Sequence, residues 1–248
     1  MRTLIMLVFC SVLWPLAASA QYQCGQVLLG GTRDVPRRHT LTRDMYCSTP
    51  IGLRLSQSHT ILDCQGHSIN RWGSQGGQGV RMGGSTLSTT AEQQHVINCT
   101  VRDWNIGIAN YYSNTTLIES SIARSNGQGI VISNTFFTTL LNVHTPGNDN
   151  DGIRMFLAYR PGVANCSANS NGDRGIYMNN VTEPLFINSQ ARRNGDPDLY
   201  FHRTTQGFLY GGIYDSMLFT TTSFNNHWCQ TVLGRVVGAG ATNFPWCP

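Results

Sequence analysis

The sequence predicts an all-β protein, a single-stranded right-handed parallel β-helix in which short strands wind around one axis. Three features predict it because they share one period. The first is a Gly-apolar-x-apolar step that recurs every 22 or 23 residues, and the other two are columns of mostly Asn residues with the same spacing. A period of this length with Gly and Asn turns is typical of one coil of a parallel β-helix, and about seven to eight coils are expected. Leucine-rich repeats have a similar period, but their fixed Leu framework and helical segment are absent from the sequence.

The Gly step predicts which residues face the core. Spacings of 27 and 28 residues around Gly79 indicate insertions in the first coils, and the step then runs regularly to Asp198-Leu199: Gly52, Gly79, Gly107, Gly129, Gly152 and Gly175. Because neighbouring strand residues point to opposite faces, the residue after each Gly should form an inward ladder: Ile130, Ile153, Ile176 and Leu199. The residue two places further on should also point inward, in a column that Asn110 interrupts: Leu55, Met82, Ile132, Met155, Met178 and Phe201.

Two Asn columns predict the turns of the coil. One column lies nine or ten residues before the Gly step: Asn98, Ser120, Asn142, Asn165 and Asn188. The other lies just before it: Asn126, Asn148, Asn171 and Asn194. Asn tolerates the left-handed backbone conformation of tight bends, and stacked Asn amides can hydrogen-bond from coil to coil.

The first residues predict an export signal. Met1-Arg2 precedes an apolar run, and Ala18-Ser19-Ala20 fits the small-residue site of signal peptidase. Residues 1–20 are therefore expected to be removed, and the mature protein is expected to be secreted or periplasmic and a monomer. No later stretch is apolar enough to predict a membrane span.

The rest of the chain divides by the clarity of the repeat. Residues 51–204 carry the β-helix repeats, whereas the segments on either side do not show the period. An open solenoid end would expose strand edges and core. Residues 21–50 are therefore predicted to form an N-terminal cap, and residues 205–248 an irregular last coil and a C-terminal cap.

The mature chain keeps seven Cys residues after Cys10 leaves with the signal. An exported protein meets oxidising conditions, so we expect Cys24–Cys47 and Cys229–Cys247 to close the two ends. Cys64 and Cys99 occupy equivalent places in neighbouring coils and should lie close enough to bond. Cys166 shares the column of Cys99 but lies three coils away, roughly 14 Å at strand spacing, and should be a buried, inert thiol. No pair has C-x-x-C spacing, so neither a thiolate metal site nor a cofactor is expected.

Charge argues against one class of partner. The chain has a formal net charge of +4 and no Lys, and its Arg residues are scattered rather than gathered in a basic run. This pattern does not predict nucleic-acid binding, and it would not repel an acidic glycan.

The segment Thr60-Ile61-Leu62-Asp63-Cys64-Gln65-Gly66-His67-Ser68-Ile69 resembles the opening coil of the right-handed parallel β-helix repeat proteins, and Asn98-Cys99-Thr100-Val101 resembles a later coil. This superfamily includes periplasmic NosD-like proteins and is similar to the pectate lyase and alginate epimerase folds. The resemblance covers most of residues 40–204. It implies the fold, and it implies action on polysaccharides, especially acidic ones. No family catalytic residue carries over. Asn148-Asp149-Asn150-Asp151-Gly152 is only a loose echo of the polygalacturonase motif, Asp196-Pro197-Asp198 lacks the His of the epimerase signature, and nothing matches the calcium-binding acids and Arg base of pectate lyases.

One outward column carries the candidate site. Arg154, Tyr177 and Tyr200 stand one coil apart, and the predicted site residues flank them: Asp149, Asp151, Arg174 and His202. Arg can hold a uronate carboxylate in a bidentate fork, and Tyr can stack on a sugar.

The candidate residues fall into two predicted roles. Catalytic candidates are Asp149, Asp151, Arg154 and Arg174, and substrate-binding candidates are Arg154, Tyr177, Tyr200 and His202. A lyase or epimerase needs carboxylate neutralisation with an acid and a base, and paired carboxylates would suit a glycoside hydrolase. The alternatives are an ordinary polar strand face and, for the two Asp residues, plain turn chemistry.

Three functions follow as hypotheses. The first is a protein that engages polysaccharide along one β-helix face; if it is an enzyme, it is a lyase, epimerase or glycoside hydrolase acting on uronate-containing glycans. The second is a non-catalytic carbohydrate-binding or surface-structural solenoid. The third is a NosD-like accessory protein for metal-centre assembly. A long cleft with convergent Arg, acid and His residues would favour the enzyme, whereas a flat face would favour a binding or structural role.

Overall fold

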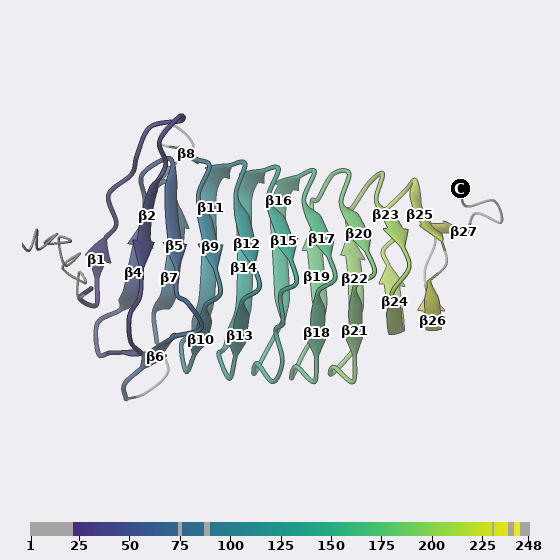
Figure 1. Cartoon of the computed structure of the whole chain (residues 1–248). Coiled ribbons are helices and arrows are strands. Elements are labelled where there is room, and N and C mark those ends of the chain that lie inside the picture. Colours follow the sequence, from purple (N-terminus) through teal and green to yellow (C-terminus); the bar gives the residue numbers. More distant parts are fainter. Residues whose placement is uncertain (1–21, 74–75, 87–89, 230, 238–240, 244–248) are drawn as a thin grey trace, which may run out of the picture.

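The computed structural model describes residues 22–73, 76–86, 90–229, 231–237 and 241–243. Within these ranges the strands of neighbouring coils pair in parallel. Short strands wind into a solenoid whose coils are stacked along one axis, with the N-terminal strands at one end and the C-terminal strands at the other (Figure 1). Each regular coil contributes strands to three faces, and the described residues form no helix. The predicted all-β, right-handed parallel β-helix is confirmed.

Face one includes the longest strands, and its strands share one sheet: β1 (Gln26–Val27), β4 (Ile51–Leu55), β7 (Gln78–Gly83), β11 (Ile106–Asn114), β14 (Gln128–Phe136), β16 (Ile153–Tyr159), β19 (Ile176–Asn179), β22 (Leu199–His202), β24 (Ile213–Phe219) and β26 (Val232–Val237). A short strand, β8 (Ala91–Glu92), pairs with the end of β11.

Face two is a sheet of ten strands: β2 (Arg37–Thr40), β5 (Thr60–Asp63), β9 (His95–Ile97), β12 (Leu117–Glu119), β15 (Thr139–Leu141), β17 (Gly162–Ala164), β20 (Leu185–Ile187), β23 (Phe208–Tyr210), β25 (Asn226–Cys229) and β27 (Ala241–Asn243). Face three carries the remaining strands: β3 (Met45–Cys47), β6 (Ser68–Arg71), β10 (Thr100–Arg102), β13 (Ile122–Arg124), β18 (Ser167–Asn169) and β21 (Gln190–Arg192). The first half of β24 pairs with β21 and its second half with β22, so this one strand joins faces one and three.

The core lies inside the coils, as the Gly step predicts. Ile130 pairs in register with Ile153, which pairs with Ile176, and this pairs with Leu199. All four side chains are fully buried. Glycine is needed beside them because a Cβ on Gly152 would lie 2.6 Å from the Asn171 amide nitrogen.

Asn110 is buried in the inward column because a small polar network satisfies its amide. Its Nδ2 donates to Thr116 Oγ1 at 2.8 Å and to Thr138 Oγ1 at 3.2 Å, and its Oδ1 accepts from Ser113 Oγ at 2.6 Å. A buried amide is tolerated only when it is hydrogen-bonded in this way. The interruption of the apolar column is therefore a local polar substitution and leaves the register unchanged.

The Asn column before the Gly step forms a hydrogen-bonded ladder. Asn126 Nδ2 donates to Asn148 Oδ1, Asn148 Nδ2 to Asn171 Oδ1, and Asn171 Nδ2 to Asn194 Oδ1, at 2.9–3.2 Å. Each Oδ1 also accepts the backbone N–H of the preceding ladder member. Asp198 ends the ladder by accepting from Asn194 Nδ2 at 2.7 Å. The residues of the other column form a turn in the left-handed backbone conformation. All of them have φ between 46° and 54°: Asn98, Ser120, Asn142, Asn165 and Asn188.

Parallel pairing extends on both sides of the predicted repeat region 51–204. In the first coil β2 pairs with β5, and at the other end β23 pairs with β25 and β25 with β27. The chain therefore makes about nine turns, more than the seven to eight expected, because the outer coils form strands without keeping the Gly step. The capping roles of residues 21–50 and 205–248 remain predictions. The export signal at residues 1–20 lies outside the described residues.

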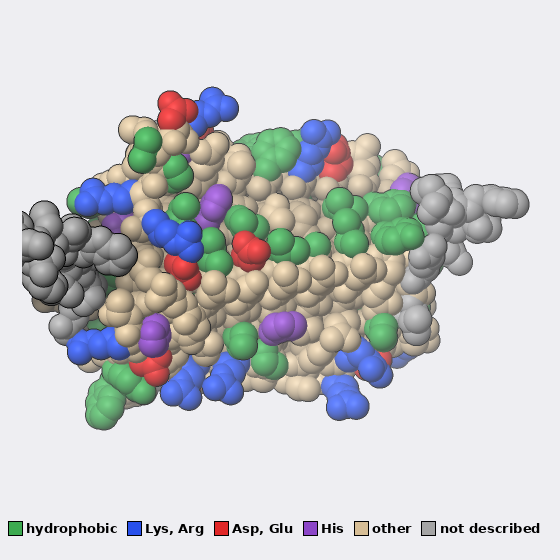
Figure 2. Space-filling view, viewed as in Figure 1, with side chains coloured by type: hydrophobic (Ala, Val, Ile, Leu, Met, Phe, Trp, Pro, Cys, Tyr) green, Lys and Arg blue, Asp and Glu red, His purple; other side chains and the backbone are tan. Residues whose placement is uncertain are grey.

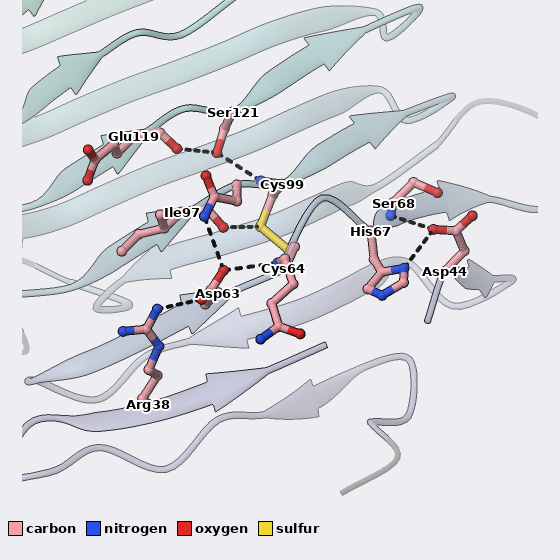
Figure 3. Close-up of a disulfide and its surroundings, with 12 residues drawn as sticks. Arg38, Asp44, Asp63, Cys64, His67, Ser68, Ile97, Cys99, Glu119 and Ser121 are labelled. Carbon is pink, nitrogen blue, oxygen red and sulfur yellow. Dashed lines mark hydrogen bonds and ion pairs between the residues drawn. A yellow bond between two sulfur atoms is a disulfide. The ribbon is translucent and has the colours of Figure 1, made fainter. Parts of the chain in front are cut away.

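Two predicted disulfides are confirmed. Cys24 bonds to Cys47, and Cys64 bonds to Cys99 across neighbouring coils. Figure 3 shows the second disulfide beside Asp63, whose carboxylate forms an ion pair with Arg38 at 2.5 Å and accepts a hydrogen bond from the Asn98 amide at 3.4 Å. The Cys64–Cys99 link thus joins β5 and β9 at a point where charge-assisted contacts also hold the first coils together.

The other cysteines differ in how far the structure tests them. Cys229 is disulfide-bonded. Its predicted partner, Cys247, lies outside the described residues, so this pairing remains a prediction. Cys166 is the free, buried thiol that its column position predicts.

We expect Cys166 to resist alkylation in the folded protein. Burial raises the pKa of its thiol to about 11 from 9.0, so the reactive thiolate is rare at about pH 8. Because the folded pKa lies above the unfolded one, the thiol's contribution to stability is complete below pH 9 and is lost as the pH rises towards 11. Peptide mapping after iodoacetamide treatment should find Cys166 modified only in denaturant. Labelling of the native protein at the unfolded rate would contradict its burial.

Candidate functional site

Arg154, Arg174, Tyr177 and Tyr200 form a compact group on the outer surface of face one, which we call the Arg–Tyr strip. Arg154 of β16 pairs in register with Tyr177 of β19, which pairs with Tyr200 of β22. The two Tyr rings are stacked with centroids 5.4 Å apart. The Arg174 guanidinium lies 4.0 Å from the centroid of Tyr177 and 5.7 Å from that of Tyr200, and the Arg154 guanidinium lies 5.5 Å from that of Tyr177. The structure therefore brings these four predicted site residues together.

The two guanidinium groups of the strip have different partners. Arg174 lies 3.0 Å from Asp151 Oδ1 through its Nε and 2.6 Å from Asp173 Oδ2 through an Nη. Arg154 makes no ion pair with any described residue. Arg174 is thus held in place by two carboxylates, whereas Arg154 leaves its charge free for a ligand.

Asp151 is an internal support of the strip. Its side chain is only 1% exposed. Its Oδ1 lies beside the charge of Arg174 but accepts no hydrogen bond from any described residue, because the contact lacks hydrogen-bond geometry. Burial raises the pKa of Asp151, and Asp173 adds to the effect, whereas Arg174 and Arg154 oppose it. A perturbed buried acid is typical of functional sites and also of structural ion pairs.

The remaining predicted residues lie at the margin. His202 of β22 makes an edge contact with Tyr200, with ring centroids 6.3 Å apart. Asp149 is exposed in the turn before β16, while Asp151 is buried, so the two acids have different environments. A matched pair of solvent-facing carboxylates is therefore not formed. The catalytic and binding roles of these residues remain predictions.

Sequence reasoning missed a second Arg and Tyr pair on the same face. The Arg81 guanidinium lies 5.7 Å from the ring centroid of Tyr111, whose hydroxyl is within 3.5 Å of the Gln78 amide. Burial raises the pKa of Tyr111, and the charges of Arg81 and Arg154 oppose this shift. Tyr111 therefore lies in the electrostatic field of both Arg residues. The signal was present in the sequence, because Arg81 shares the outward column of Arg154, but Tyr111 stands two places beyond that column.

Short side chains continue the outward column beyond Arg154, towards the N-terminal coils. Ala109 and Val131 occupy the outward column between Arg81 and Arg154, and both are buried because they are short side chains among longer neighbours. A cavity of about 230 Å³ lies at the other end of the strip, where it is lined by Leu218, the in-register neighbour of Tyr200, and by Arg235. This cavity would give an extended chain that lies along the strip a recess beside Tyr200.

Two structural findings bear on other kinds of site. Across the described ranges, no three His, Cys, Asp or Glu side chains gather in a way that could hold a metal ion. The same part of the chain contains no helix that is long and apolar enough to cross a membrane.

Parallel coils, an internal Asn ladder and an outward column of Arg and Tyr define a parallel β-solenoid with a polar, aromatic face. The family model described as the right-handed β-helix region matches residues 78–228, more than half of the sequence. The chain therefore belongs to the right-handed β-helix family. No curated protein matches its sequence.

Solved structures with the same fold share little sequence with this chain. The Dettilon tailspike protein gp208 has a TM-score of 0.56 and 11% identity over 83% of this chain and 56% of its own. The pectate lyase Pel9A has a TM-score of 0.55 and 11% identity over 90% and 68%. The enzymatically active domain of tailspike protein 2 of bacteriophage CBA120 has a TM-score of 0.51 and 13% identity over 82% and 38%. These similarities establish the fold alone, and this chain spans little more than half of gp208.

Proposed function

We propose that this protein binds an acidic, uronate-containing polysaccharide along the Arg–Tyr strip, outside the cytoplasm. The observation that carries the proposal is Arg154, a cation over an aromatic ring with no carboxylate partner among the described residues. A guanidinium in this setting can form a bidentate pair with a carboxylate. The two disulfides, which persist under oxidising conditions, support the location.

The geometry suits a repeating ligand. Successive coils repeat about every 4.8 Å, so Arg154, Tyr177 and Tyr200 offer a cation and two stacked rings at regular steps along the axis. Arg174 keeps its guanidinium against both rings because Asp151 and Asp173 hold it there. The rings are therefore fixed before a ligand arrives, which lowers the entropy lost on binding.

Replacing Arg154 with Ala should weaken binding to oligogalacturonate by about 1.5–3 kcal/mol, because a charge-assisted pair is lost. Arg124→Ala is the matched control, since Arg124 is an exposed Arg of β13 on face three. Isothermal titration of the mature wild type and both variants measures the difference. Equal affinities of the two variants would place the site elsewhere, and no binding by the wild type would favour a structural solenoid.

One observation keeps an enzymatic version as a second candidate. Tyr177, Tyr200 and His202 lie beside the unpaired Arg154, and Tyr and His are residue types that can act as acid or base next to a neutralised uronate. A lyase would generate unsaturated ends that increase ultraviolet absorbance when oligouronates are incubated with the protein. Binding without an increase in absorbance would contradict the lyase and leave binding as the proposed function.

A further inference from the structure

A second candidate site lies at the turn between faces one and two. A cavity of about 520 Å³ opens there, within the size range of small-ligand sites, and its lining includes Arg33, His59, Glu92, Gln93, Asn114 and Phe136. It takes residues from several coils, because Glu92 of β8 pairs in register with Asn114 of β11 and this with Phe136 of β14. Figure 1 places β8 at the upper edge of the solenoid, and Figure 2 shows hydrophobic side chains beside charged ones along that edge.

Three aromatic rings form a platform on this edge. Phe136 and Phe137 are each 46% exposed, and both rings lie 6.0 Å from the ring centroid of Tyr159 on the next coil. Hydrogen bonds between neighbouring coils hold the backbone of the platform, from Thr115 N to Phe136 O and from Phe137 N to Tyr159 O. Neither Phe ring is needed to fill the core.

Phe137 is also in an unfavourable conformation for its residue type. Its φ of 53° lies in the left-handed region, where a bulky side chain is an outlier and Asn or Gly is preferred. Neighbouring coils take the same conformation at the equivalent turn position, with Thr115 and Arg160. Phe137 differs from them in presenting an exposed aromatic ring to the cavity.

Polar groups complete the site. The Asn114 side chain lines the cavity, and its buried Oδ1 accepts no hydrogen bond from any described residue. This Oδ1 has no contact with solvent, so a ligand hydroxyl would satisfy it after the amide rotates towards the cavity. Opposite charges line the cavity in Arg33 and Glu92, and beside the platform Arg160 is paired with Glu183 at 2.5 Å. The site thus has no excess of either charge, unlike the Arg–Tyr strip.

We propose that this cavity binds an uncharged saccharide, with the Phe136 ring against the apolar face of a sugar and Asn114 Oδ1 accepting a sugar hydroxyl. Rings that offer an apolar surface next to an unfilled acceptor match a ligand whose C–H groups and hydroxyls lie on different sides. The site is separate from the Arg–Tyr strip and does not depend on the proposed function.

The test is a titration of the mature protein with cellohexaose, mannohexaose and maltohexaose, combined with saturation-transfer NMR. For whichever of the three sugars binds the wild type, Phe136→Ala should weaken the affinity by about tenfold, because the variant loses the apolar contact between the ring and the sugar. Asn114→Ala, which removes the acceptor while leaving the platform in place, should weaken it several-fold. Arg154→Ala should leave it unchanged, which separates this site from the strip.

The matched control is Phe224→Ala. Phe224 is 54% exposed and stands in the same axial column as Phe136, beyond Tyr159, Thr182 and Thr205. Equal affinities of the Phe136 and Phe224 variants would overturn the proposal, as would the absence of binding to all three sugars. Self-association of the wild type that Phe136→Ala abolishes and no sugar affects would overturn it in favour of a protein contact.

Discussion

Ile153→Asp should destabilise the protein by about 4 kcal/mol or more, because an unpaired charge would be buried in the core of the solenoid. Ile153 is fully buried and lies in register between Ile130 and Ile176. Neither neighbour offers a hydrogen-bonding side chain to a carboxylate. Chemical denaturation followed by circular dichroism measures the loss of stability.

Leu157→Asp provides the control within the same strand. Leu157 of β16 is 45% exposed, so an Asp there stays in water and should change stability by less than about 0.5 kcal/mol. Its φ of 51° also suits Asp better than Leu. If Ile153→Asp melted like the wild type while Leu157→Asp did not, the inward and outward assignment of β16 would be wrong.

Removing the Cys64–Cys99 disulfide with a double Ser substitution should cost about 3–4 kcal/mol, because the link closes a loop with a sequence separation of 35. The cost should also appear as early opening of the first coils, since β5 and β9 lose their covalent join. Hydrogen exchange of β5 and β9 compared with β19 and β20 locates the change.

Cys166→Ala is the control for that experiment, because Cys166 is a buried cysteine outside any disulfide. It should destabilise the protein less and leave the exchange of β5 and β9 unchanged. Similar losses of stability in the two variants, with no local effect, would show that the disulfide contributes little beyond packing.

The sequence predicts the middle of the solenoid well, because the same physical demand recurs in every coil. Ile153 needs a buried place next to a Gly, and Asn148 needs a donor and an acceptor one coil away on either side; both requirements leave a period that can be read. Cys64 and Cys99 are predictable for the same reason, since equivalent places in neighbouring coils are close in space.

The ends and one turn column could not be predicted in this way. β2 and β25 pair through backbone hydrogen bonds, which place little demand on residue type. The turn before face two needs a left-handed backbone, yet different residue types supply it: Gln93, Thr115, Phe137, Arg160 and Glu183. The cavity beside Phe136 was therefore missed, although the register that builds it follows the same repeat.

The candidate site was predictable as an arrangement but not in its electrostatics. The period places Arg154, Tyr177 and Tyr200 on one column, and it places Arg174 and Asp151 at the same edge. It does not show that Asp151 is buried, or that Arg174 is held by two acids while Arg154 is free. Those differences depend on side-chain contacts between coils, and they decide which cation can meet a ligand.

A crystal structure of the mature protein with oligogalacturonate tests the central claim most directly. We expect a uronate carboxylate within hydrogen-bond distance of the Arg154 guanidinium and a sugar ring against Tyr177 or Tyr200. Oligogalacturonate bound instead on the ten-stranded face two, or in the cavity beside Phe136 with the Arg–Tyr strip empty, would contradict it.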